Sequence, residues 1–165
     1  MTTDPHGTLA TDAEGTTVRF ERWYPTSVDD LWSALTERDR VGRWLGALHG
    51  DLRTGGRFEL RMGDDLPGAD QNATGEVVAC DPPHGFAVSW AFPGEAETCV
   101  RATLRPDGDG VVLVLVHSGL TLSAARGYGG GWHASLDLLD DAVAGRPARS
   151  WQEAFEAALP AYREA

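Results

Sequence analysis

The sequence predicts an α+β fold, in which a curved antiparallel sheet of about six strands packs on one long C-terminal helix. Three observations predict this fold. A strand-like segment near the N-terminal end is followed by two short helical segments. Five more strand-like segments follow with short turns between them, and a helical segment with a single apolar stripe comes after the last strand. Successive strands before a final helix are typical of the α+β class.

The first strand and the two short helices come directly after the N-terminal segment. The run Thr17–Tyr24 alternates, with Val18 and Phe20 on one face. Ser27 then has the residue type of a helix N-cap. Apolar residues recur after it at helical spacing: Val28, Leu31, Trp32 and Leu35. A second turn of helix is expected over 37–43.

The remaining strands form an antiparallel meander. They are predicted over 57–62, 73–80, 86–92, 97–105 and 111–118. Turn-forming proline, glycine and aspartate residues separate them. The last strand is apolar on both faces, with Leu113, Leu115 and His117 on one face and Val112, Val114 and Val116 on the other. Because strands of an antiparallel sheet are usually polar on their solvent side, we expect both faces to be covered.

The long helix is predicted over 130–144, and Gly145 and Pro147 end it. Its apolar stripe consists of Trp132, Leu136, Leu139 and Val143. We expect this stripe to pack on the concave face of the sheet. The glycine-rich residues 127–131 are interpreted as a flexible hinge at the mouth of a pocket, because glycine is conformationally permissive.

Three regions are predicted along the chain: a flexible N-terminal tail over 1–15, one domain over 16–146 and a C-terminal extension over 147–165. In the extension, Ser150 and Glu153 have the spacing of a capping box, so a short helix is predicted there. One face of that helix carries Trp151, Phe155 and Leu159. We expect this face, or a second subunit, to cover the outer valines of the last strand.

Composition and charge argue against several classes of partner. The net charge is −11, and all 14 basic residues are arginine. An acidic surface repels phosphate backbones and anionic headgroups, so neither a nucleic acid nor a membrane partner is expected. The first residues lack the apolar run of a signal peptide, and no stretch is apolar enough to span a membrane, so we expect a cytoplasmic protein. Cys80 and Cys99 do not make a disulfide framework.

Five stretches occur in an order and at spacings that match one family: DDLWSALTERDRVGRWLG, LRTGGRFELRM, TGEVVACDPPHGFAVSW, DGVVLVLVHSG and GYGGGWHASLDLLDDAVAG. On these stretches the chain resembles the activator of heat-shock-protein-90 ATPase homologue-like family, within the START-like (SRPBCC) superfamily. The resemblance implies a helix-grip fold with a cavity between the sheet and the C-terminal helix. It does not imply cochaperone activity, because the chain corresponds to only one domain of the two-domain protein that gives the family its name.

The apolar faces and the resemblance together indicate a set of candidate pocket residues: Trp44, Phe58, Leu60, Trp90, Leu115, His117, Trp132, His133, Leu136 and Leu139. An apolar cavity with few polar groups is typical of small-molecule sites. His117 is the best polar candidate, because its position in the strand turns it toward the helix. No catalytic residue, metal site or cofactor is predicted, since the histidines lack metal-ligand spacing and Ser118 points to the opposite face from His117.

Three functions are compatible with this reading. The favoured one is a module that binds a hydrophobic small molecule beneath the helix. The second is an enzyme of the same fold, such as a polyketide cyclase or aromatase with His117 or His133 as acid/base. The third is a protein-interaction role, either chaperone regulation or formation of a homodimer through the outer valines.

Overall fold

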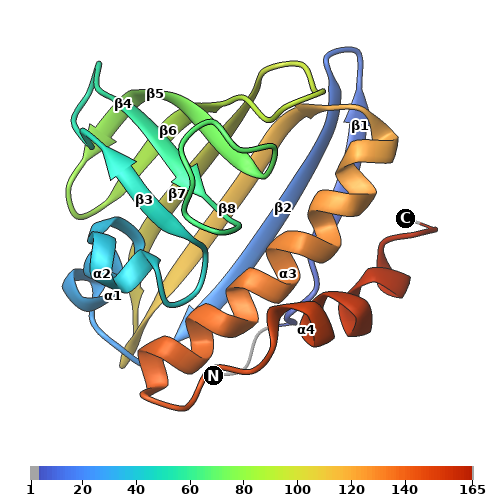
Figure 1. The fold of residues 1–165 in the computed structure, drawn as a ribbon. Helices are drawn as coiled ribbons and strands as arrows, with labels where there is room; N and C mark the ends of the chain where they lie inside the picture. Colours follow the sequence, from blue (N-terminus) through green and yellow to red (C-terminus); the bar gives the residue numbers. More distant parts are fainter. Residues whose placement is uncertain (1–3, 165) are drawn as a thin grey trace.

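The computed structural model describes residues 4–164 as one curved antiparallel sheet wrapped around a long helix (Figure 1). The strands are β1 (Thr8–Asp12), β2 (Gly15–Tyr24), β3 (Ala47–Gly50), β4 (Arg57–Arg61), β5 (Asn72–Asp81), β6 (Gly85–Trp90), β7 (Thr98–Asp107) and β8 (Gly110–Leu120). The helices are α1 (Val28–Thr36), α2 (Arg38–Val41), α3 (Leu122–Ala144) and α4 (Trp151–Ala158), and a 3₁₀ turn spans Leu159–Ala161. The strands pair in the order β1-β2-β8-β7-β6-β5-β4-β3.

The α+β class and the long C-terminal helix are confirmed, but the sheet has eight strands rather than about six. The strand β3 was not predicted, because it has only four residues, which is too short for a periodic pattern. The strand β1 lies in the segment 1–15, which was predicted to be a flexible tail. It pairs with β2 from Thr8 opposite Arg19 to Asp12 opposite Gly15. Because β1 is an edge strand with few buried side chains, its sequence shows no alternation of apolar and polar residues.

The element α1 begins and packs as its sequence predicts. The Ser27 side chain accepts a hydrogen bond from the backbone N–H of Asp30 at 3.0 Å, which satisfies one of the free donors of the first turn. The buried side of the helix carries Leu31, Ala34 and Leu35. In Figure 1, α1 and α2 lie beside β3 at the far end of the sheet from α4.

The helix α3 starts at Leu122, eight residues before the predicted start at 130. Thr121 caps it by accepting a hydrogen bond from the Ala124 N–H at 3.1 Å. The glycines at 127–131 are therefore helical, and the prediction of a hinge there is wrong. A Cβ on Gly129 would lie 2.6 Å from the Tyr162 ring, and one on Gly130 would lie 3.0 Å from Leu159. Because Gly129 and Gly130 have no side chains, the C-terminal segment can pack closely on α3.

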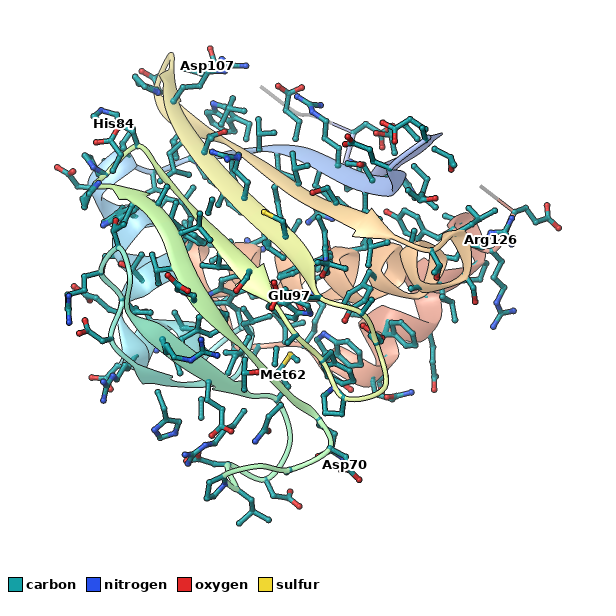
Figure 2. All side chains as sticks on the ribbon, turned by 90° about the horizontal axis from the view of Figure 1, so that it is seen from above. Met62, Asp70, His84, Glu97, Asp107 and Arg126 are labelled. Atoms are coloured by element: carbon teal, nitrogen blue, oxygen red, sulfur yellow. The ribbon has the colours of Figure 1, made fainter. Side chains whose placement is uncertain are left out.

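The stripe of α3 packs on the concave face of the sheet as expected. Trp132, Leu136 and Leu139 are buried there, and Val143 is partly buried at the end of the helix. The helix ends at Gly145, whose φ of 71° is left-handed and suits glycine. Seen from above in Figure 2, the turn that holds His84 and the end of β7 at Asp107 lie at one end of the sheet, and Arg126 of α3 lies at the other.

The outer face of β8 is not covered by the C-terminal helix, so that prediction is wrong. The helix α4 packs on α3 instead (Figure 1). Val112 is buried between its strand neighbours Trp23 and Arg105. Val116 lies between Arg19 and Arg101 in register, and it is half-buried by them. Long side chains on neighbouring strands thus shield these valines, and cover by a second subunit stays a prediction.

The short C-terminal helix itself is confirmed as α4. Ser150 accepts a hydrogen bond from the Glu153 N–H at 3.3 Å, in line with the predicted capping pattern. None of the helices within residues 4–164 is long and apolar enough to cross a bilayer.

Candidate functional site

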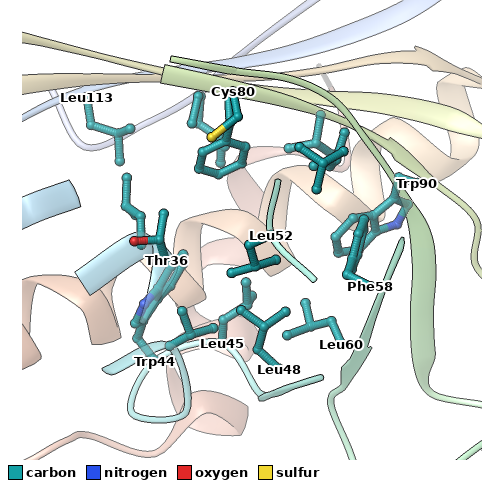
Figure 3. A pocket seen from close by; sticks show the side chains of 18 of the residues that line it. Thr36, Trp44, Leu45, Leu48, Leu52, Phe58, Leu60, Cys80, Trp90 and Leu113 are labelled. Atoms are coloured by element: carbon teal, nitrogen blue, oxygen red, sulfur yellow. The ribbon is translucent and has the colours of Figure 1, made fainter. Parts of the chain in front are cut away.

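A small apolar chamber lies between the concave face of the sheet, the segment from α1 to β3, and α3. Its volume is about 100 Å³. Figure 3 shows Leu113 and Cys80 pointing into it from the sheet, with Trp44, Leu48 and Leu52 facing them. The lining is hydrocarbon apart from the Cys80 thiol, the Thr36 hydroxyl and the indole N–H groups of three tryptophans, and the Thr36 hydroxyl already donates to the Trp32 carbonyl at 2.8 Å. The chamber therefore offers shape and dispersion contacts to an occupant.

A wider cleft of about 680 Å³ adjoins the chamber. Its walls come from the segment between α2 and β3, the β4–β5 and β6–β7 loops, α3 from Ala124 to Leu138, and α4. The two spaces share four wall residues, namely Trp44, Leu45, Trp90 and Trp132. At the cleft the polar side chains include Arg43, Gln71 and Glu95. A molecule that filled both spaces would have its apolar part inside and its polar part at the rim.

The three tryptophans between chamber and cleft have their indole N–H groups bonded within the protein. Trp44 donates to the Ala34 carbonyl at 2.9 Å, Trp90 to the Tyr128 hydroxyl at 3.0 Å, and Trp132 to His117 Nδ1 at 3.0 Å. A buried indole needs such a partner. The rings consequently line the space in fixed orientations and present carbon surface to it.

The acceptor for Trp132 belongs to a longer chain of hydrogen bonds. Because His117 Nδ1 accepts, the neutral ring carries its proton on Nε2, which lies 2.7 Å from the Thr98 hydroxyl oxygen. Thr98 in turn donates to the Trp90 carbonyl at 3.3 Å. Both ring nitrogens of His117 are thus occupied by side chains that pack on the concave face of the sheet.

Burial lowers the pKa of the His117 imidazole from 6.5 to about 4. The neutral ring is also the form that the indole N–H requires, since a protonated Nδ1 would oppose it. The Tyr128 hydroxyl donates to Glu95 Oε1 at 2.7 Å, and burial together with this carboxylate raises the pKa of Tyr128. The His117 imidazole and the Tyr128 hydroxyl are therefore both uncharged near neutral pH.

Seven of the ten candidate residues line the chamber: Trp44, Phe58, Leu60, Trp90, Leu115, Trp132 and Leu136. His117 does not line the chamber itself, but it accepts the hydrogen bond from the indole of Trp132, which does. His133 and Leu139 are elsewhere. Leu139 is buried in the core and lines neither space. Whether the seven residues hold a ligand stays a prediction.

His133 projects to the side of α3 that faces the two chain ends. Its Nδ1 lies 2.7 Å from the Tyr162 hydroxyl, and its Nε2 lies 3.6 Å from Asp137. Asp137 is paired with the buried Arg22 at 2.8 Å. Burial, and then the charge of Arg22, lower the pKa of His133. This histidine belongs to the contact between the N-terminal segment and the C-terminal helix, outside the chamber.

Sequence reasoning missed two groups of lining residues. Leu45, Leu48 and Leu52 enter the chamber from a segment without regular periodicity, so only the tertiary fold brings them there. Trp151 and Phe155 line the cleft. Their shared helical face was recognisable in the sequence, but the surface that this face meets was not.

A curved antiparallel sheet that holds a C-terminal helix above an apolar cavity defines the START-like, or SRPBCC, class of domain. The chain belongs to the family described as Activator of Hsp90 ATPase homolog 1-like protein, which matches residues 25–144. The match ends with α3, so α4 lies beyond it.

Solved structures of similar proteins support this assignment. CalU16 from Micromonospora echinospora has 29% identity and a TM-score of 0.77, over 96% of this chain and 94% of that chain. A protein from Bordetella parapertussis has 27% identity and a TM-score of 0.73, over 99% and 95%. DynU16, a protein of the dynemicin biosynthetic locus, has 27% identity and a TM-score of 0.73, over 81% of this chain and 49% of DynU16. A sequence comparison with curated proteins gives no significant match.

Proposed function

We propose that the protein binds a hydrophobic small molecule in the chamber and the adjoining cleft. One observation carries the proposal: an apolar chamber of about 100 Å³ and a cleft of about 680 Å³ share tryptophan walls whose N–H groups are already bonded inside the protein. Sites for small molecules are concave and mostly apolar, with a few polar groups that orient the ligand. In this protein the polar side chains Arg43, Gln71 and Glu95 lie at the cleft.

Burial of apolar surface would supply the affinity, at roughly 25 cal/mol for each Å² removed from water. The membership of DynU16 in a biosynthetic locus supports a small molecule as the kind of ligand. Binding is favoured over acid/base catalysis by the lining of the chamber, which among residues 4–164 includes no carboxylate, imidazole or basic side chain. Of the two candidate acid/base residues, His117 is neutral and hydrogen-bonded at both nitrogens, and His133 lies outside the chamber, beside the Tyr162 hydroxyl.

The test is a thermal-shift panel of fatty acids, alkanols and polycyclic aromatic compounds. A ligand at about 100 times its Kd adds about 2.7 kcal/mol to the free energy of unfolding, which raises Tm by several degrees. The variant Ala102→Leu fills the chamber from the buried face of β7, and Thr103→Leu adds the same side chain on the exposed face. We expect Ala102→Leu to weaken binding and Thr103→Leu to leave it unchanged.

The smaller substitution Ala102→Val covers the case in which leucine disturbs the fold, and urea unfolding without ligand verifies each variant. The proposal is contradicted if no compound of the panel shifts Tm, or if the chamber-filling and surface variants bind equally well.

A further inference from the structure

The C-terminal helix α4 forms one wall of the cleft, although it lies outside the residues that match the family. Two of its aromatic side chains, Trp151 and Phe155, lie in that wall. Their rings stack, with centroids 5.0 Å apart and planes 7° apart. Trp151 remains 39% exposed, whereas tryptophan side chains are highly buried on average.

The indole of Trp151 is held in one orientation. Its Nε1 donates to the Ser135 hydroxyl of α3 at 3.0 Å, so the polar edge of the ring is turned to the helix. A Cβ at Gly131 would lie 3.9 Å from the ring, an ordinary van der Waals distance, so the indole lies over the Gly131 position of α3. The ring surface that this contact leaves free belongs to the cleft wall.

The helix that carries these rings is anchored at both ends. At its start, the Arg149 side chain donates to both oxygens of the buried Asp141, each at 2.9 Å. Just after its end, the Tyr162 hydroxyl lies 2.7 Å from His133 Nδ1 and accepts from the Gly7 N–H at 2.9 Å. The exposed aromatic pair is therefore part of a fixed wall.

We propose that Trp151 and Phe155 are specificity-determining residues that select a ligand with a flat aromatic ring system. The ring system would lie in the cleft against this pair, with Trp90, Tyr128 and Trp132 supplying aromatic surface elsewhere in the same cleft. Aromatic rings prefer offset-stacked or edge-to-face contacts, which a wall of this kind provides. An apolar substituent of the ligand would extend toward the chamber past Trp90 and Trp132.

This inference rests on the proposed function and adds the ligand class to it. A small molecule is the occupant to which the geometry points, because the pair lies in a concave cleft that shares its walls with the chamber rather than on an open face. The volume of about 680 Å³ accommodates a polycyclic ring system.

The test compares two carboxylate probes that differ in shape, 1-pyrenebutyrate with a flat aromatic body and dodecanoate with an aliphatic chain. Calorimetric titration gives the Kd of each for the full chain and for Trp151→Leu, Phe155→Leu and the control Leu122→Ala. Leu122 is 40% exposed and is not part of the cleft, so it matches Trp151 in exposure alone. If Trp151→Leu folds poorly, Phe155→Leu still tests the role of the aromatic pair.

We expect the Kd of pyrenebutyrate to rise about 5- to 150-fold in Trp151→Leu, the range spanned by stacking contacts with an aromatic side chain. Phe155→Leu should raise it by a smaller factor. The Kd of dodecanoate should change less than about twofold in either, and Leu122→Ala should change neither Kd.

Three results would overturn the inference, and they are distinguishable. If the native chain binds both probes and the two α4 variants bind pyrenebutyrate as tightly, the proposed function stands and the role of the aromatic pair fails. If both probes lose affinity equally, the wall is merely hydrophobic and does not select aromatic rings. If the native chain binds neither probe, the inference fails together with the proposed function.

Discussion

The indole Nε1 of Trp132 donates a hydrogen bond of 3.0 Å to Nδ1 of His117, joining α3 to the strand β8 beneath it. The bond determines the tautomer of His117 and the orientation of an indole that lines both chamber and cleft. Since both partners are buried, the pair acts as a polar connection within an otherwise apolar layer.

Replacing His117 by leucine should lower the free energy of unfolding by about 1–3 kcal/mol, because it leaves the buried N–H of Trp132 without a partner. Urea unfolding monitored by tryptophan fluorescence measures the change. The control is His84→Leu, a histidine whose side chain is 65% exposed, which should have little effect. Equal stability of the native chain and His117→Leu would mean that the bond contributes nothing.

Stability should fall as the pH is lowered from about 6.5 to about 4. The unfolded histidine has a pKa near 6.5, while burial lowers the pKa of His117 in the folded protein to about 4. In that window the unfolded chain binds the proton first, so the full stability is present above pH 6.5 and lost toward pH 4. At about 1.4 kcal/mol per pKa unit, the loss amounts to at most about 3.5 kcal/mol.

The measurement is the free energy of unfolding at several pH values between about 6.5 and 4, for the native chain and for His117→Leu. The difference between the two curves gives the contribution of His117 to the pH dependence. The variant should show a shallower slope, although not a flat one, because the pKa of His133 is also lowered and contributes in the same direction. Parallel curves for the two proteins would assign the pH dependence to other groups.

The Asp141 carboxylate should be required for the docking of α4. Its side chain is 4% exposed and accepts hydrogen bonds from the side chains of Arg146 and Arg149, which hold its pKa well below the usual range. Asp141→Asn should cost about 1–3 kcal/mol and speed hydrogen exchange in α4. Asp140→Asn is the matched control, since that side chain is 45% exposed and makes one longer contact with Arg146. Unchanged exchange in α4 for Asp141→Asn would show that other contacts suffice.

Two glycines of α3 should respond to alanine with opposite signs. At Gly129 the added methyl would lie 2.6 Å from the Tyr162 ring, so Gly129→Ala should destabilise the protein by about 1–3 kcal/mol. At Gly127 nothing lies within 4 Å, so Gly127→Ala should stabilise it by about 0.8–1 kcal/mol through helix propensity. Thermal unfolding of the pair is the measurement, and stabilisation by both substitutions would contradict the proposed contact with the C-terminal segment.

Much of the fold was predictable because its signals are local. The capping residues Ser27 and Ser150 and the apolar stripe of α3 each depend on residues within a few positions of one another. The same holds for the hairpin turn between β7 and β8. The edge strand β1 escaped prediction because a strand that is exposed along almost its whole length has no periodic pattern of buried residues.

The sequence by itself determined the order of the elements other than β1 and β3, the family, and which faces are apolar, because these follow from side-chain chemistry and spacing along the chain. Only the tertiary structure decided what covers each apolar face. It placed Trp151 and Phe155 against α3 and the cleft rather than over Val116, and it made the glycines at 127–131 part of a continuous helix. It also gave His117 its indole partner. An apolar pattern specifies that a surface will be buried, whereas the partner that buries it depends on contacts between residues far apart in the chain.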